Sequence, residues 1–198
     1  MKYIIFFIIT VFLNNQNIIA QDSLKEFYNI DFKWKLSIPS GFINVAQEEI
    51  SHFKKTGDSA IGEVNGKKFE NESTLIFALK NGDYNLFDAS YESYDSLIDG
   101  VYLSSCKNLY NTTYKIFTTQ APNVFSVDTT ISTELIDNLL FQKMYMRIFY
   151  TNNKFWHTLT YNRLFGNKSL TVNISFADFD KGELMIESWE KSKFGNTK

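Results

Sequence analysis

The sequence is poor in the residues that build disulfides, metal centres and nucleic-acid-binding surfaces. Its 198 residues include 1 cysteine and 2 histidines, and 20 basic side chains stand against 22 acidic ones. One cysteine excludes an intramolecular disulfide, and two separate histidines without a cysteine pair argue against a zinc site. A net charge of −2 provides no electrostatic attraction for nucleic acid. We therefore expect no metal, no cofactor and no nucleic-acid partner.

The motifs of common catalytic sites are also missing. The chain has no glycine-rich phosphate loop, no Gly-x-Ser-x-Gly elbow and no calcium-loop spacing among its aspartates. Cys106 falls on the apolar side of a predicted helix, where a lone cysteine is typically a small buried hydrophobic residue. His157 is expected to be a neutral core histidine. We predict that the chain has no catalytic residue and is not an enzyme.

The first 20 residues have the pattern of a Sec-type signal peptide. Lys2 precedes the apolar run Tyr3–Leu13, which is too short to span a bilayer comfortably, and Ala20 ends the segment on a small residue. We expect cleavage before Gln21 and an extracytoplasmic product, periplasmic or secreted, with no stable membrane insertion after cleavage. An uncleaved anchor is the alternative. Residues 21–198 show no domain boundary and are predicted to form a single domain.

Residues Phe125–Ala177 predict four antiparallel strands in a row. Their turn signals are Asp137-Asn138, Asn152-Asn153 and Gly166-Asn167, and asparagine and glycine tolerate the positive φ of tight hairpins. Two-residue loops at these positions set the register of the strands. The predicted cross-strand pairs include Leu135 with Leu140, Asp128 with Arg147, Ile148 with His157, Met146 with Leu159, and Leu159 with Ile174.

This register sorts the four strands into one apolar and one polar sheet face. A slip of one residue in any strand would reverse its two faces. The apolar face comprises Val127, Ile131, Leu135, Met144, Met146, Ile148, Leu159, Tyr161, Val172, Ile174 and Phe176. We expect the polar face to be exposed to solvent, as is common for antiparallel sheets.

The remaining elements predict an α+β fold. Alternation indicates strands over residues Phe32–Ile38 and Thr74–Lys80. Helical periodicity indicates helices over Ala46–Thr56 and Asp95–Tyr110, and a final helix capped by Asp180. The expected architecture is an antiparallel sheet, formed by the C-terminal four-strand meander and the N-terminal strands, packed with about three α-helices.

This order of elements resembles the PsbP-like superfamily, which includes the Ran-binding Mog protein and the periplasmic protein DcrB. The resemblance rests on the opening strand that ends in Ile38-Pro39-Ser40-Gly41-Phe42, on the strand, long helix and meander that follow, and on the closing segment Ser188–Phe194. The resemblance extends over nearly all of residues 21–198, and the sequence motifs that support it are short. It implies an α/β/α sandwich around an antiparallel sheet and a binding role without catalysis.

The predicted polar face contains a candidate partner-binding surface. Aromatic and arginine side chains are enriched at binding hot spots, and here they lie among hydroxyls and amides. The candidate residues are Tyr145, Arg147, Trp156, Thr158, Thr160 and Asn173. The partner would be a protein or a carbohydrate. The alternative is that a helix, such as the one expected over Ala46–Thr56, covers Trp156 and Phe149 and forms a small second core there.

These observations favour a secreted or periplasmic, non-catalytic binding protein. Two alternatives remain at this stage. The first is an extracytoplasmic hydrolase whose site is assembled from scattered residues. The second is an immunity or inhibitor protein that acts on a secreted toxin.

Overall fold

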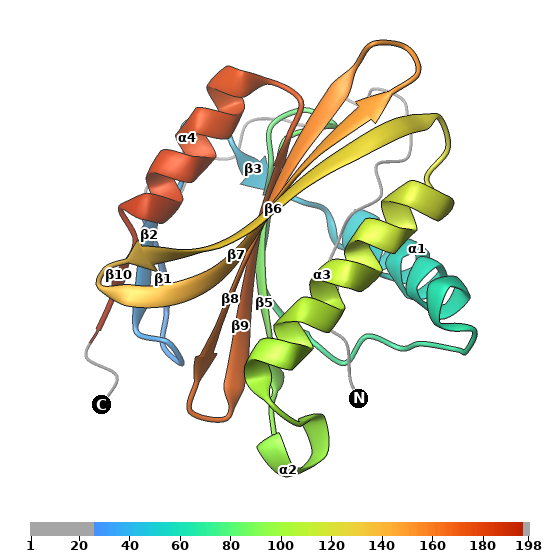
Figure 1. The fold of residues 1–198 in the computed structure, drawn as a ribbon. Helices are drawn as coiled ribbons and strands as arrows, with labels where there is room; N and C mark the ends of the chain where they lie inside the picture. Colours follow the sequence, from blue (N-terminus) through green and yellow to red (C-terminus); the bar gives the residue numbers. More distant parts are fainter. Residues whose placement is uncertain (1–25, 196–198) are drawn as a thin grey trace.

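The computed structural model describes residues 26–195, and these form one α+β unit around an antiparallel sheet (Figure 1). The predicted signal peptide Met1–Ala20 and the cleavage site at Gln21 lie outside the described residues. Within residues 26–195, none of the helices has the length and apolar character needed to cross a bilayer.

The main sheet has seven strands, all paired antiparallel, in the order β3-β4-β5-β9-β8-β7-β6. Its strands, in chain order, are β3 (Ile43–Asn44), β4 (Thr74–Lys80), β5 (Leu86–Ser93), β6 (Val124–Ile136), β7 (Leu139–Tyr150), β8 (Phe155–Phe165) and β9 (Lys168–Phe176). The helices are α1 (Gln47–Asn65), α2 (Ser96–Asp99), α3 (Tyr102–Thr119) and α4 (Phe179–Glu190).

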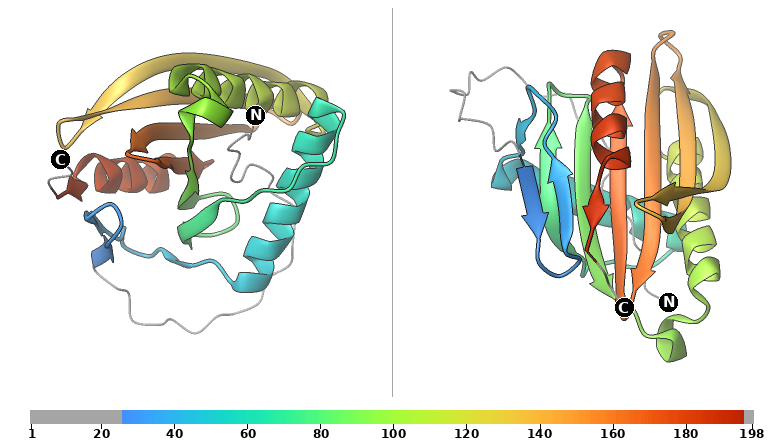
Figure 2. Two further views of the ribbon diagram at one scale, coloured as in Figure 1. Left: turned by 90° about the horizontal axis from the view of Figure 1, so that it is seen from below. Right: turned by 90° about the vertical axis from the view of Figure 1, so that its left-hand side faces the viewer.

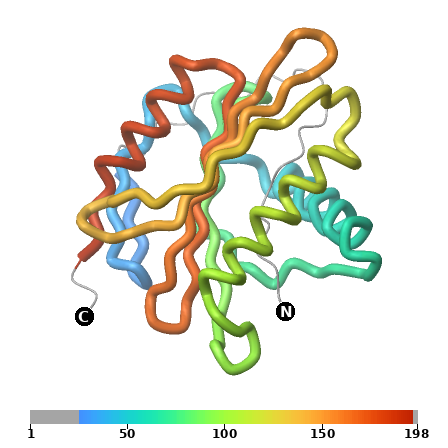
Figure 3. The backbone as a smooth tube through the Cα atoms, viewed as in Figure 1, coloured from blue at the N-terminus to red at the C-terminus, as the bar shows by residue number. Residues whose placement is uncertain are grey.

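A second, three-stranded sheet has the order β1-β2-β10. It consists of β1 (Glu26–Asn29), β2 (Trp34–Ser37) and β10 (Lys193–Phe194). This small sheet and α4 cover one face of the main sheet, and α1 and α3 lie on the other side (Figures 2 and 3). The sandwich expected from the resemblance is therefore present, with three layers and both faces of the main sheet covered.

Two of the three predicted hairpin registers are confirmed. Leu135 pairs with Leu140 across β6 and β7, and Leu159 pairs with Ile174 across β8 and β9. These hairpins turn through Asp137-Asn138 and through Gly166-Asn167, and Asp137, Asn138 and Gly166 have the positive φ that such tight turns require.

The predicted register between β7 and β8 is wrong by one residue. Ile148 pairs with Trp156, not with His157, and Met146 pairs with Thr158. The connecting loop has three residues, because the Tyr150 N–H donates to the Lys154 carbonyl at 2.8 Å. Asn153, the last of the three, has φ 61, as in a type I turn followed by a left-handed residue. The sequence Thr-Asn-Asn-Lys is compatible with the predicted two-residue loop and with the observed three-residue loop.

This slip rearranges the two sheet faces. Met144, Met146 and Ile148 are buried on the α1 and α3 side, together with the even-numbered residues of β8. The apolar residues of β8 and β9 face α4 and the small sheet instead: Leu159, Tyr161, Val172, Ile174 and Phe176. The predicted single apolar face is therefore wrong, and so is the predicted solvent-exposed polar face.

Several element boundaries also differ from the predictions. The helix predicted over Asp95–Tyr110 is two helices, because Gly100 (φ 80, ψ −149) interrupts it with a conformation that only glycine adopts readily. The last helix is capped by the Asp178 carboxylate, which accepts from the Lys181 N–H, and not by Asp180. The strand β5 (Leu86–Ser93) was not predicted.

Aromatic side chains hold α4 and the small sheet onto the main sheet. The Trp189 ring of α4 lies 5.7 Å from Trp34 of β2 and 5.1 Å from Phe141 of β7, centroid to centroid. Gly182 permits the close approach of α4, because a Cβ there would come within 2.5 Å of the Phe176 ring of β9. These contacts form the larger of the two main hydrophobic cores.

Candidate functional site

The predicted partner-binding face is not one surface. Thr158, Thr160 and Asn173 lie on the α1 and α3 side and are almost fully buried. Tyr145 and Arg147 lie on the opposite side of the sheet, because of the one-residue shift between β7 and β8. Arg147 is partly exposed and forms the predicted cross-strand ion pair with Asp128, at 2.9 Å.

Trp156, the sixth candidate residue, belongs to the second core. It is 4% exposed, and its ring lies 6.3 Å from that of Phe117 in α3. The alternative, in which a helix covers Trp156, is therefore correct. The covering helices are α3 and the second half of α1, not residues 46–56. Phe149 is on the other side of the sheet, where the Arg147 guanidinium lies over its ring.

The centre of the main sheet has an unusual face toward α1 and α3. Along their central stretch, its three middle strands, β5, β9 and β8, present a block of short polar side chains there, and each of these side chains is at most 5% exposed. We call this set the polar floor. It comprises Asp88, Ser90, Thr158, Thr160, Asn162, Thr171, Asn173 and Ser175. Apolar cores flank it on both sides, with β4 and the start of α1 on one side and β7 and α3 on the other.

Hydrogen bonds join part of the polar floor across the strands. The Asn173 Nδ2 donates to the Asp88 Oδ2 at 2.9 Å, and the Thr160 hydroxyl donates to the Asn173 Oδ1 at 3.1 Å. Asn162 Nδ2 donates to the Thr171 hydroxyl at 2.8 Å. Burial raises the pKa of the Asp88 carboxyl to about 8, so this group is mostly protonated at neutral pH.

Other polar atoms of the floor are buried without a protein partner. They are Ser90 Oγ, Thr158 Oγ1, Ser175 Oγ and Asn162 Oδ1. A buried polar atom that forms no hydrogen bond costs about 1–3 kcal/mol. Four such atoms on one sheet face leave hydrogen-bonding capacity that an added polar group could use.

An apolar cavity adjoins the polar floor at the β7–β8 end of the sheet. It has a volume of about 710 Å³ and lies between the second half of α1, the C-terminal end of α3 and the turn between β7 and β8. Its walls include Ala60, Ile116, Phe117, Trp156 and Ala177. Trp156 is held in place by its indole N–H, which donates to the Tyr84 carbonyl at 3.1 Å.

Two strands lead from the wall of the cavity to the polar floor. Trp156 precedes Thr158 by two residues on β8, and Ala177 follows Ser175 by two residues at the end of β9. Residues two apart on a strand point to the same face and are separated by roughly 7 Å. The two unpartnered hydroxyls of Thr158 and Ser175 are cross-strand neighbours and form the first row of the floor beyond the cavity.

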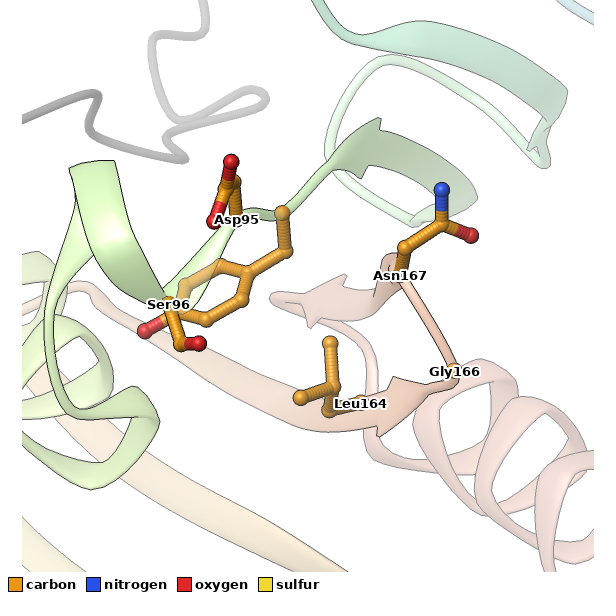
Figure 4. A pocket seen from close by; sticks show the side chains of 6 residues that line it. Asp95, Ser96, Leu164, Gly166 and Asn167 are labelled. Carbon is orange, nitrogen blue, oxygen red and sulfur yellow. The ribbon is translucent and has the colours of Figure 1, made fainter.

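A second, shallower hollow of about 360 Å³ lies where the start of α2 meets the β8–β9 turn (Figure 4). Asp95 and Asn167 contribute polar groups to it. The Asp95 carboxylate already caps α2 by accepting from the Leu97 N–H at 2.9 Å, and the Asn167 carbonyl accepts from the Tyr94 N–H at 2.8 Å. These groups serve the local turn, so the hollow presents a weaker case for a site.

His157 is buried, as predicted, and it lies on the α4 side of the sheet, opposite to Ile148. Its ring stacks on Phe176, and its Nδ1 shares a hydrogen bond of 2.5 Å with the Tyr145 hydroxyl. Burial, and then the nearby Arg147 charge, lower the pKa of the histidine and favour its neutral form. Residues 26–195 contain no group of three or more histidine, cysteine, aspartate or glutamate side chains placed to hold a metal ion.

Cys106 is expected to react with a thiol reagent only after denaturation. The thiol is 4% exposed within α3, and burial raises its pKa to about 11, so the reactive thiolate is scarce at neutral pH. Labelling with Ellman's reagent at pH 8, in the native state and in denaturant, measures this difference. Fast, complete labelling of the native protein would contradict the buried position.

Sequence reasoning missed Asp88 and Ser90 because it missed β5. The signal was present: Phe87, Ala89 and Tyr91 alternate with polar residues over Leu86–Ser93, with the period of a strand. No comparable sequence pattern predicts the cavity, which is bounded by residues from α1, α3, β7, β8 and four connecting loops.

Comparison with known proteins supports the fold assignment. No protein-family model matches the sequence. No curated protein sequence matches it either. Among solved structures, the chain is similar to the solution structure of cyanobacterial PsbP (CyanoP) from Synechocystis sp. PCC 6803, with a TM-score of 0.52 and 10% sequence identity over 92% of this chain and 99% of that one. The resemblance stated from sequence is thereby confirmed at the level of fold: this chain has a PsbP-like α+β fold.

Proposed function

We propose that this PsbP-like chain is a non-catalytic, extracytoplasmic binding protein and that its ligand occupies the apolar cavity beside Trp156. The observation that carries the proposal is the cavity itself. Its volume of about 710 Å³ falls within the range of roughly 300–1,000 Å³ that is usual for small-molecule sites. Apolar walls with a few polar groups at the edge are also characteristic of such sites.

The composition of the walls favours binding over hydrolysis. Neither of the two histidines of the chain lines the cavity. At its edge, the Thr56 hydroxyl donates to the His52 carbonyl within α1 at 3.0 Å, and the exposed Ser59 hydroxyl donates to the exposed Glu63 carboxylate of the same helix at 3.4 Å. A hydrolytic site would also need an oxyanion-stabilising group beside such a serine and a position shielded from water, whereas this pair lies on the exposed surface of the helix. The rigid, aromatic wall is instead suited to holding an apolar molecule.

The proposal predicts saturable binding of N-phenyl-1-naphthylamine, an uncharged apolar fluorophore. Its emission is expected to rise on entering the cavity, with energy transfer from Trp156. Trp34 and Trp189 lie in the other core, so Trp156→Phe should remove most of the transfer and retain the binding. Fluorescence titration of the purified protein measures both effects.

A blocking variant tests the location of the fluorophore. Ala177 is exposed and lines the cavity, so Ala177→Phe should fill part of it and weaken binding by about tenfold, or 1.4 kcal/mol. Ala46→Phe is the matched control, because Ala46 is also exposed but does not line the cavity. Absence of saturable binding, or equal affinity in the two variants, would refute the proposed site.

A further inference from the structure

We infer that the polar floor is the second half of the binding site and that the ligand is amphipathic, with an apolar body in the cavity and an uncharged, hydroxyl- or amide-bearing head group on the floor. This inference rests on the proposed function, because it assumes that the cavity beside Trp156 is the point of entry.

Two unpartnered hydroxyls of the polar floor lie on the side nearest the cavity. Thr158 and Ser175 are paired across β8 and β9, and both side-chain oxygens are buried without a partner. They are the first polar side chains that a molecule would meet on passing along the sheet beyond Trp156 and Ala177. A hydroxyl or amide placed there would satisfy both oxygens and recover the cost of leaving them without hydrogen bonds.

The polar floor extends over two further rows of side chains. Beyond the first row, Asp88, Asn173 and Thr160 form a hydrogen-bonded row. The next row again contains unpartnered atoms, Asn162 Oδ1 and Ser90 Oγ. Rows two residues apart are roughly 7 Å apart, so the near and far unpartnered atoms are separated by roughly 14 Å. A head group that bears several hydroxyls or amides fits this spacing better than a single polar atom.

The polar floor carries little charge. Asp88 is its only ionisable side chain, and the raised pKa of that carboxyl, about 8, keeps it mostly uncharged at neutral pH. No buried cation faces it within the polar floor. A charged head group would therefore be buried without a countercharge, which is costly, whereas hydroxyls and amides need only hydrogen bonds. The floor thus selects for uncharged polar groups.

The test uses displacement of N-phenyl-1-naphthylamine by three amphiphiles with the same ten-carbon chain: 1-decanol, decanoate and decyltrimethylammonium. The double variant Thr158→Val, Ser175→Ala removes the two first-row hydroxyls and breaks no hydrogen bond of the protein. Thr129→Val, at an exposed position of β6, is the control. Thermal melts establish that each variant is folded, and the two single variants provide a second measurement.

We expect 1-decanol to bind the double variant about tenfold more weakly than it binds the wild type and the Thr129→Val control. The affinity of the fluorophore and of the two ions should stay unchanged. If 1-decanol displaces the fluorophore equally from all proteins, the polar floor takes no part and this inference fails, while the proposed function stands. If the double variant weakens an ion and not the alcohol, the head group is charged and the inference is wrong. If the fluorophore does not bind the wild type, the proposed function itself fails.

Discussion

Replacing Trp189 by alanine is expected to lower the free energy of unfolding by about 3–5 kcal/mol, as for other buried aromatic side chains. The Trp189 ring is fully buried, and it contacts the small sheet through Trp34 and the main sheet through Phe141 and Tyr161. Its loss therefore opens a cavity where α4, the small sheet and the main sheet meet. Chemical denaturation monitored by circular dichroism measures the effect.

The matched control is Trp189→Phe. A phenyl ring keeps most of the aromatic contacts and removes the indole N–H, which is buried without a partner in the structure. We expect the phenylalanine variant to lose much less stability than the alanine variant. If both variants lost less than about 1 kcal/mol, the typical scale of an average substitution, the aromatic cluster would not be what joins α4 and the small sheet to the main sheet.

Replacing Asp88 by asparagine is expected to increase stability in a manner that depends on pH. Burial raises the pKa of the Asp88 carboxyl from its ordinary value of 3.8 to about 8 in the folded protein. An asparagine oxygen can still accept the hydrogen bond from Asn173 Nδ2, and it carries no ionisable proton. The variant therefore keeps the hydrogen bond from Asn173 and has no group that titrates at position 88.

The direction of the pH effect follows from proton linkage. Between about pH 4 and pH 8 the folded state holds a proton on Asp88 that the unfolded state has released. Raising the pH through this window therefore favours the unfolded wild type. Below it both states are protonated, and above it both are ionised, so the contribution of Asp88 levels off at each end. Each unit of pKa difference corresponds to about 1.4 kcal/mol.

We therefore expect the stability advantage of Asp88→Asn over wild type to grow from pH 4 to pH 8, by several kcal/mol, and then to level off. Denaturant unfolding of both proteins at a series of pH values measures this difference directly. Ser90→Ala, one row away on the same strand, carries no titratable group and should show a pH-independent difference from wild type. A constant difference between Asp88→Asn and wild type across pH 4–8 would mean that the carboxyl titrates normally.

Two hairpin registers were predicted correctly and one was not. This contrast shows where local sequence information is sufficient. Asp137-Asn138 and Gly166-Asn167 each permit one compact turn, and the registers they predict are those of the structure. Thr151–Asn153 permits two loop lengths whose local energies are similar. The choice between them depends on which side of β8 is buried under α3, and that is a tertiary contact.

The same shift between β7 and β8 divides the predicted binding face between the two sides of the sheet. Once the register of β7 and β8 is known, Tyr145 and Arg147 separate from Trp156, Thr158, Thr160 and Asn173. The polar alternation of β8 and β9 was readable from sequence, but its meaning was not. A row of threonine, serine and asparagine predicts an exposed face, because these side chains are polar. Only the tertiary structure reveals that helices lie on that side (Figure 2).

The sequence by itself determined the α+β class, the order of the meander, two of its three registers and the buried positions of Cys106 and His157. Each of these depends on periodicity or turn chemistry within a short stretch of chain. The tertiary structure alone decided the β7–β8 register, the burial of the polar floor and the cavity beside Trp156. Those features arise where α1, α3 and distant strands meet, and the energy that selects them is spread over contacts between residues far apart in the chain, so no local pattern encodes them.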